Sequence, residues 1–327
     1  MEDPSGPAGP DSRALVYAPG NKGLSVAGAS VLLPRRARTS PRAEPTPRRN
    51  GRPSPVGPPL HRARALGFTV NAAAAPASRA RSSIYGDSAP VYDRIYAWKE
   101  YAKEARVVRG LVRRFGPPNA RTLLDVACGT GGHLAYLSRW FESTGIDASP
   151  AMIALARQKV PRARFLVGRM QGFRLSQRFD VITCLFSSIG YARSEVDLVR
   201  TLRNFAAHLS PGGIVIVEPW LTPQVYRAGR PGFSHLGSRE SPLVRLHVSE
   251  RRGERSIMDM HHLAVIDGAV RHWVERHDMG LFDRATMRRA FRLAGFTVRS
   301  MPGLFPLGRG LYLGTSTAQN LPSRTPR

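Results

Sequence analysis

The chain has 327 residues, a formal net charge of +26 and only two cysteines, Cys128 and Cys184. These cysteines form neither a C-x-x-C pair nor a disulfide framework, so we expect a protein of the reducing cytoplasm. Only four of the 49 basic residues are lysines, and arginine is spread through every segment rather than gathered into one stripe, a pattern that fits a general arginine bias as well as a nucleic-acid-binding face. We expect no nucleic-acid partner; positive charge would equally steer an anionic small substrate into a cleft.

Residues 1–83 differ in composition from the rest. They hold 13 of the 27 prolines and 13 basic against four acidic residues, with no helical or strand period. Such a segment cannot bury enough apolar surface to offset about 1–2 kcal/mol of backbone entropy per residue, so we expect a disordered extension, and a disordered tail over residues 317–327. The apolar run at residues 24–33 is too short to span a bilayer and lacks a basic flank, so we expect neither membrane insertion nor export.

The folded part is expected to begin near residue 84. A helix is predicted over residues 93–115, where apolar side chains share one face until Gly116-Pro117-Pro118 ends it. Strands and helices then alternate: strands at 122–127, 143–147, 164–168, 179–186 and 214–218, and helices at 132–140, 150–160 and 196–209. This alternation predicts an α/β fold with a doubly wound, mainly parallel sheet and a ligand site at the carboxyl ends of its strands.

The pattern changes after residue 219. Three antiparallel strands are predicted, at 243–248, 255–265 and 270–277, and Asp267-Gly268 is a hairpin signal between the last two. A helix at 284–293, with Gly295 behind it, and two antiparallel edge strands, at 296–300 and 310–315, complete the chain. We expect residues 219–280 to be an antiparallel β insertion that lies over the active site and selects the substrate.

A glycine loop, D-x-A-C-G-T-G-G, follows the first predicted strand. Its glycines allow positive φ or let a ligand lie directly on the backbone. The dinucleotide fingerprint is excluded because Leu134 stands where the third glycine is needed. What remains resembles the S-adenosylmethionine loop of class I methyltransferases, which implies this cofactor and a seven-stranded, Rossmann-like sheet. The cofactor contacts that we predict here are Asp125, Ala127, Cys128, Gly129 and Gly131.

A second acid supports this prediction. Asp147 ends the next predicted strand, sixteen residues beyond Gly131, roughly where a carboxylate would bind both ribose hydroxyls of a nucleoside. The alternative is that Asp147 caps the helix starting at Pro150, in competition with Ser149. The other predicted cofactor contacts are Ala148, Met170 and Phe186.

Several motifs carry a more particular resemblance. They are VYDRIY (91–96), KEY (99–101), LLDVACGTGGHL (123–134), FSSIGY (186–191), PGGIVIVEPW (211–220) and GRGLYLG (308–314). In this order they resemble the N,N-dimethyltransferases of nucleotide-linked 3-amino-deoxysugars, which complete antibiotic sugars such as desosamine and mycaminose. The resemblance spans residues 84–316 and implies methylation of an amino group. Residues 1–83 have no counterpart in that family.

The resemblance also implies residue roles. Tyr96 and Tyr191 would line the reacting amine as catalytic residues; the alternative is that each is a half-buried packing residue. Arg309, between two glycines, would bind the nucleotide pyrophosphate; the alternative is a solvated charge. Ser187 and Ser188 would contact the substrate.

One residue departs from the family. Arg169 stands where the family usually has an aspartate that binds the adenine amino group, and arginine cannot accept that hydrogen bond. Either Met170 and nearby apolar groups hold the adenine, or cofactor affinity is reduced. Two other interpretations remain: a methyltransferase for another small molecule with a nitrogen or oxygen acceptor, and a basic polyanion-binding protein with a degenerate cofactor site. A homodimer is left open.

Six of the nine histidines fall between residues 234 and 277. None has H-E-x-x-H or Cys/His ligand spacing, so we predict no metal site. We interpret Glu218, at the end of the fifth predicted strand, as a structural carboxylate rather than the base.

Overall fold

The computed structural model describes residues 85–305 and 309–316, which fall in one structural unit. The disorder expected for residues 1–83 and 317–327 lies outside the described residues. Within the described ranges, no helix is long and apolar enough to cross a membrane.

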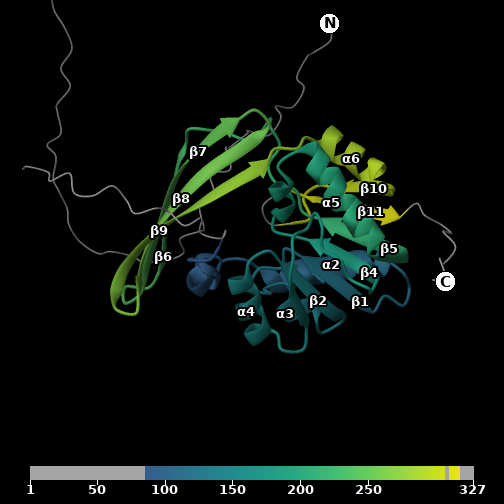
Figure 1. Ribbon diagram of the computed structural model, residues 1–327, viewed down its shortest axis with the longest axis horizontal. Helices are drawn as coiled ribbons and strands as arrows, with labels where there is room; N and C mark the ends of the chain where they lie inside the picture. Colours follow the sequence, from purple (N-terminus) through teal and green to yellow (C-terminus); the bar gives the residue numbers. More distant parts are fainter. Residues whose placement is uncertain (1–84, 306–308, 317–327) are drawn as a thin grey trace, which may run out of the picture. The chain divides into compact units, whose positions relative to one another are not determined.

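Seven strands form one mixed sheet in the order β10-β11-β5-β4-β1-β2-β3 (Figure 1). The neighbours among β1 to β5 are parallel, whereas β11 runs antiparallel to both β5 and β10. The strand order reverses between β1 and β4, so their carboxyl ends flank a topological switch point, where open α/β sheets bind ligands. This confirms the predicted doubly wound, mainly parallel sheet. The bounds are β1 (Thr122–Val126), β2 (Glu142–Asp147), β3 (Arg164–Val167), β4 (Phe179–Cys184), β5 (Leu209–Val217), β10 (Phe296–Met301) and β11 (Leu311–Ser316).

Helices cover both faces of this sheet. On one face, α5 and α6 bury Phe205 and Phe291 in a core shared with the sheet. On the other face, α2, α3 and α4 bury side chains such as Val108 and Ile153. The bounds of the α-helices are α1 (Tyr92–Ile95), α2 (Tyr101–Phe115), α3 (Leu134–Leu137), α4 (Pro150–Lys159), α5 (Glu195–Ala207) and α6 (Arg284–Leu293), and two short 3₁₀ helices are η1 (Ala89–Val91) and η2 (Ser188–Ala192).

The prediction of a single helix over residues 93–115 is wrong. The chain forms α1, leaves the helical conformation at Tyr96, and starts α2 at Tyr101. Between the two helices the Lys99 side chain turns inward and binds Glu104 at 2.6 Å. Apolar spacing did not reveal this break, although the helices on its two sides bury their side chains in different cores: Ile95 of α1 packs with the four-stranded sheet, and Val108 of α2 packs with the seven-stranded one.

The helix predicted over residues 132–140 is much shorter than expected. Only Leu134–Leu137 is α-helical, and the backbone hydrogen bonds around it mix the α-helical spacing of four residues with the 3₁₀ spacing of three. The Ser138 N–H donates to the Leu134 carbonyl at 3.0 Å, but the Trp140 N–H donates to the Leu137 carbonyl at 2.9 Å. Such 3₁₀-like turns are common at helix ends. Only a short helix therefore follows the glycine loop, so it can stabilise an anion only close to its own N-terminus.

Strand β5 begins earlier than predicted, at Leu209 instead of Ile214, and so includes Pro211-Gly212-Gly213. The strand runs through these residues with a register shift against β4. Gly212 takes a φ of +73°, and an added Cβ on Gly213 would lie 2.9 Å from the Asp180 carbonyl oxygen. The two glycines thus build a bulge instead of a turn.

A second, four-stranded antiparallel sheet has the order β6-β7-β8-β9. Asp267 and Gly268 both take positive φ in the β8–β9 hairpin, which confirms the predicted turn. β6 was not predicted. One face of this sheet packs on η1 and α1 through Leu243, Ala264 and Trp273. The bounds are β6 (Pro231–Gly237), β7 (Pro242–Arg252), β8 (Arg255–Ile266) and β9 (Ala269–Gly280).

Candidate active site

The glycine loop, residues 127–132, joins β1 to α3 at the carboxyl edge of the seven-stranded sheet. Ala127, Gly129 and Gly131 have left-handed backbones, with φ of +60°, +56° and +79°. Gly132 lies against the Tyr101 ring, where an added Cβ would stand 2.6 Å from a ring carbon. The left-handed backbones at Gly129 and Gly131 favour glycine, and the missing Cβ of Gly132 makes room for the Tyr101 ring.

Asp147 holds this loop in place. Its carboxylate accepts hydrogen bonds from the backbone N–H groups of Gly129 and Ser149, each at 2.9 Å. Ser149 caps α4, since its hydroxyl accepts a hydrogen bond from the Met152 N–H. Each carboxylate oxygen of Asp147 can accept a further bond, so the geometry favours the ribose-binding interpretation over the capping one. Burial raises the pKa of Asp147, and its backbone hydrogen bonds oppose that rise.

A small cavity opens at the glycine loop, beside the N-terminal helices. Asp125 lies in its wall and accepts a hydrogen bond from the Thr183 hydroxyl at 2.7 Å; burial raises the pKa of Asp125 to about 6. Gly131 does not line the cavity and faces Ala156 and Phe165 instead. The lining residues predicted from sequence are Asp125, Ala127, Cys128, Gly129, Phe186 and Ser188. Those not predicted as site residues are Tyr92, Tyr101, Thr130, Gly132, His133 and Leu185.

A buried ionic cluster supports this cavity and was missed from sequence. Glu104 binds the Lys99 ammonium at 2.6 and 2.7 Å and His133 Nε2 at 2.7 Å. Burial would raise the pKa of Glu104, but the His133 hydrogen bond and the Lys99 charge lower it overall. The Lys99 ammonium also lies 4.2 Å from the centre of the Phe186 ring. One sequence signal was available: Lys99 is one of only four lysines in an arginine-rich chain.

The chain turns sharply after β4. Phe186 and Ser187 both take left-handed backbones, with φ of +53° and +60°. Glu218, at the end of β5, accepts a hydrogen bond from the Phe186 N–H at 2.6 Å, and the Ser187 hydroxyl donates to the Pro219 carbonyl at 2.7 Å. Burial raises the pKa of Glu218. These contacts fit the structural role expected for this carboxylate.

Arg309 reaches into the same strand-end region. Its Nη1 donates to the Ser187 hydroxyl at 2.6 Å and lies 3.9 Å from a Glu218 oxygen, while the guanidinium lies 4.7 Å from the Trp220 ring centre. The side chain is only 11% exposed. The alternative of a solvated surface charge is therefore wrong, and Arg309 contacts another predicted site residue, Ser187.

The two predicted catalytic tyrosines belong to one aromatic cluster. The Tyr96 ring lies 5.0 Å from Phe186, and its hydroxyl accepts a hydrogen bond from Arg245 at 3.4 Å. The Tyr191 hydroxyl lies 2.5 Å from the Tyr85 hydroxyl. Burial raises the pKa values of both Tyr96 and Tyr191, so both phenols are neutral at physiological pH.

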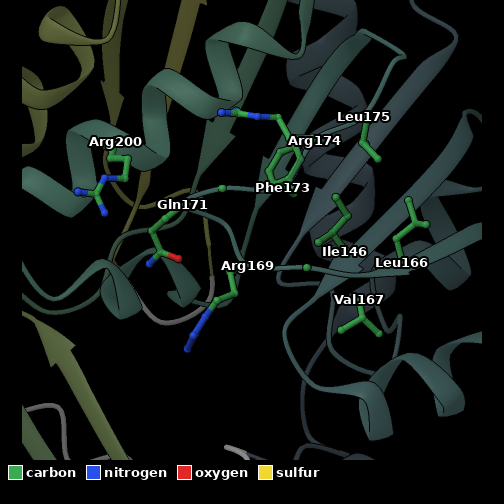
Figure 2. A pocket seen from close by; sticks show the side chains of 11 residues that line it. Ile146, Leu166, Val167, Arg169, Gln171, Phe173, Arg174, Leu175 and Arg200 are labelled. Atoms are coloured by element: carbon green, nitrogen blue, oxygen red, sulfur yellow. The ribbon is translucent and has the colours of Figure 1, made fainter.

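The remaining predicted cofactor contacts flank β2 and β3. Ala148 is exposed, whereas Met170 is buried and its carbonyl accepts a hydrogen bond from Asn204 at 3.1 Å. Arg169 is exposed and lines a groove beside β3; Figure 2 shows it pointing away from Arg174 and Arg200. Much of its lining comes from residues 168–175, in the segment that joins β3 to β4 without a helix. Among residues 85–305 and 309–316, no three His, Cys, Asp or Glu side chains gather as a metal site.

Comparisons with known proteins agree with this geometry. Residues 123–213 match the model of the methyltransferase domain family. The chain is 40% identical over 238 residues to the dTDP-3-amino-3,6-dideoxy-alpha-D-glucopyranose N,N-dimethyltransferase of Streptomyces fradiae, a match that covers 72% of this chain and 92% of that protein. This chain belongs to the S-adenosylmethionine-dependent N-methyltransferases of amino-deoxysugars. Its methyl donor is S-adenosylmethionine, as predicted.

Solved structures of the family confirm the fold of this N-methyltransferase. DesVI of Streptomyces venezuelae is 37% identical, with a TM-score of 0.66 over 71% of this chain and 99% of DesVI. CalS10 of Micromonospora echinaspora, an amino pentose methyltransferase solved with bound S-adenosylmethionine, is 32% identical, with a TM-score of 0.63 over 69% of this chain and 97% of CalS10. The interpretation as a polyanion-binding protein with a degenerate cofactor site is thereby excluded.

Proposed function

We propose that this enzyme transfers methyl groups from S-adenosylmethionine to the amino group of a dTDP-linked amino-deoxysugar, twice in succession. The observation that carries the substrate class is Arg309, a nearly buried guanidinium held at the strand ends by Ser187 and Trp220. A planar guanidinium matches two oxygens of a phosphate or pyrophosphate. The two-step outcome is supported by the similarity to the Streptomyces fradiae relative, which is an N,N-dimethyltransferase.

The chain's residues fit the cofactor. Glycine at positions 129 and 131 lets a ligand approach the loop backbone closely, and the Asp147 carboxylate, already bonded to that loop, would hold the ribose hydroxyls. Asp125, Ala127, Cys128 and Phe186 would line the cofactor site from the loop and from β4. Exposed Ala148 and buried Met170 would contact the adenine without help from a carboxylate at position 169. When bound, S-adenosylmethionine supplies an electrophilic methyl group on a sulfonium.

The protein has to position a neutral amine in line with that methyl group. Orientation of this kind can contribute about 7–11 kcal/mol to lowering the barrier. Tyr96 and Tyr191 suit the task because burial keeps both phenols protonated, so they can bond to an uncharged amine without trapping it as an ammonium ion. Arg309, Ser187 and Ser188 would bind the nucleotide-sugar part of the substrate.

We also propose a homodimer. Five large apolar side chains on the four-stranded sheet are exposed although they share one face of it: Phe233, Leu246, Val248, Leu263 and Val270. An apolar sheet face of this kind on a charged protein suits a second copy of the same face. Light scattering should show a dimer that Leu246→Asp dissociates, whereas Val196→Asp, an exposed residue of α5, should leave it intact. A wild-type monomer at assay concentration would contradict this proposal.

The two cysteines are free and buried, consistent with a cytoplasmic setting.

The test of function is product identity. The purified enzyme, S-adenosylmethionine and dTDP-3-amino-3,6-dideoxyglucose should give first a monomethylated and then a dimethylated nucleotide sugar by mass spectrometry, with both methyl groups on nitrogen by NMR. Methylation of oxygen, or no methylation of any dTDP-linked amino sugar, would contradict the proposal.

A further inference from the structure

His277 is a buried histidine of β9 that adjoins a predicted catalytic residue. It is 3% exposed, and its Nδ1 lies 2.7 Å from the Tyr191 hydroxyl. The Tyr191 hydroxyl in turn lies 2.5 Å from that of Tyr85, whose ring is 5.5 Å from the imidazole. Three side chains from distant parts of the sequence thus form one hydrogen-bonded chain.

The surroundings of the imidazole fix its tautomer. Among the described residues, His277 Nε2 has no hydrogen-bond partner, and it lies 3.8 Å from a carboxylate oxygen of Glu275. Glu275 accepts a hydrogen bond from the Ser88 hydroxyl, which orients that carboxylate. An N–H facing a carboxylate is favourable, whereas a nitrogen lone pair facing it would be repelled. The proton therefore sits on Nε2, and Nδ1 is an acceptor.

The imidazole is also held neutral. Burial, together with the nearby His262, Arg245 and His247, lowers the pKa of His277 to about 3, and Asp259 opposes this change. Because neutral Nδ1 can only accept, the Tyr191 hydroxyl must donate to it. The Tyr191 oxygen then accepts from Tyr85 and retains one acceptor position.

We propose that His277 is a positioning residue for methyl transfer: it fixes the Tyr191 hydroxyl so that the remaining lone pair of that oxygen accepts an N–H of the substrate amine. This inference rests on the proposed function. With one N–H held, the amine lone pair is directed at the methyl carbon. The nitrogen forms the new C–N bond with this pair as the S–C bond breaks and its electrons pass to sulfur, and the resulting ammonium releases a proton to water.

The two methylations should depend on this contact unequally. A primary amine has two N–H groups, either of which can bind Tyr191, whereas the monomethylated amine has only one. The neutral dimethylated amine has none, so it loses the contact and can leave. Loss of the oriented lone pair should therefore slow the second transfer more than the first.

His277→Leu and His277→Asn separate positioning from packing, because an asparagine oxygen can replace Nδ1 as an acceptor. We expect His277→Leu to lower kcat of the second methylation at least about tenfold and to accumulate the monomethylated product, with KM for the sugar nucleotide and Kd for S-adenosylmethionine changed less than about twofold. His277→Asn should stay within about threefold of wild type. The double variant Tyr191→Phe/His277→Leu should be no slower than the worse single variant, since the two residues act as one unit.

Tyr85→Phe provides a second test should His277→Leu fail to fold. We expect the monomethylated product to accumulate in this variant too, but to a smaller extent. Normal dimethylation by His277→Leu, an effect confined to KM, or additive losses in the double variant would overturn the inference. These outcomes are distinct from failure of the proposed function, in which the wild-type enzyme itself would not methylate the nucleotide-linked amine.

Discussion

The Asp147 carboxylate accepts a hydrogen bond from the backbone N–H of Gly129 at 2.9 Å, so the acid that ends β2 closes the glycine loop that follows β1. One side chain thereby orders the loop, and in the proposed cofactor complex its remaining acceptor positions would bind the ribose. Loss of this carboxylate should affect the cofactor before it affects the sugar substrate.

We expect Asp147→Ala to weaken S-adenosylmethionine binding by about 1–3 kcal/mol, because two ribose hydroxyls lose a charged acceptor in a buried site. Calorimetry with S-adenosylhomocysteine measures this. Glu142→Gln is the control, since Glu142 is exposed at the other end of the same strand. Equal affinity in folded Asp147→Ala and wild type would rule out Asp147 as the ribose ligand.

Asp125 should make cofactor binding depend on pH. Burial raises the pKa of this carboxyl to about 6, so it is largely protonated below that pH and ionised above it. The ionised form attracts the positive sulfonium, so the Kd of S-adenosylmethionine should fall as the pH rises from about 5 to about 7, by up to roughly tenfold. Asp125→Asn should remove most of this slope. The same slope in both proteins would show that another group is responsible.

The buried Glu104 should matter mainly for stability. Glu104→Gln leaves the Lys99 charge without its partner, which should destabilise the fold by about 3–5 kcal/mol. The exposed pair of Glu100 and Lys103 gives the control: Glu100→Gln should cost less than about 1 kcal/mol. Denaturant unfolding at neutral pH compares the two, and equal losses would refute a special role for the buried cluster.

The Glu104 carboxylate should also make the stability of the fold depend on pH in the acid range. Its folded pKa is lowered from the usual 4.5, so its stabilising contribution is complete above that pH and is lost as the pH falls through the lowered folded value. Wild-type stability should therefore drop more steeply below about pH 4.5 than that of Glu104→Gln. Parallel pH profiles would contradict this assignment.

Local signals explain which elements could be predicted from the sequence. The α6 bounds matched because Asp283 accepts a hydrogen bond from the Thr286 N–H at its start and Gly295 takes a φ of +84° just beyond its end. The Asp267-Gly268 hairpin is equally local. The glycine loop and Asp147 could be recognised together because a strand, a tight turn and an acid recur at fixed spacing in nucleoside-binding sheets.

Features set by side-chain contacts or by strand pairing, rather than by a periodic pattern, could not be predicted. The break before α2 depends on Lys99 turning toward Glu104, and β6 exists through its pairing with β7 rather than through a strong strand pattern of its own. His277 belongs to the site only because folding brings it to Tyr191, 86 residues away in sequence. No periodicity within β9 marks that contact.

Substrate choice gives the most direct measurement of the central claim. It compares kcat/KM for a dTDP-linked amino-deoxysugar and for the same amino sugar without its nucleotide, in wild type, Arg309→Lys and the exposed control Arg292→Lys. We expect wild type to prefer the nucleotide-linked sugar at least about hundredfold, and Arg309→Lys to raise KM for it at least about tenfold, a loss of roughly 1.4 kcal/mol, because an ammonium cannot match two phosphate oxygens at once. Cofactor affinity should stay unchanged in all three proteins. Equal turnover of the free sugar by wild type, or an Arg309→Lys variant indistinguishable from Arg292→Lys, would contradict a nucleotide-linked substrate held by Arg309.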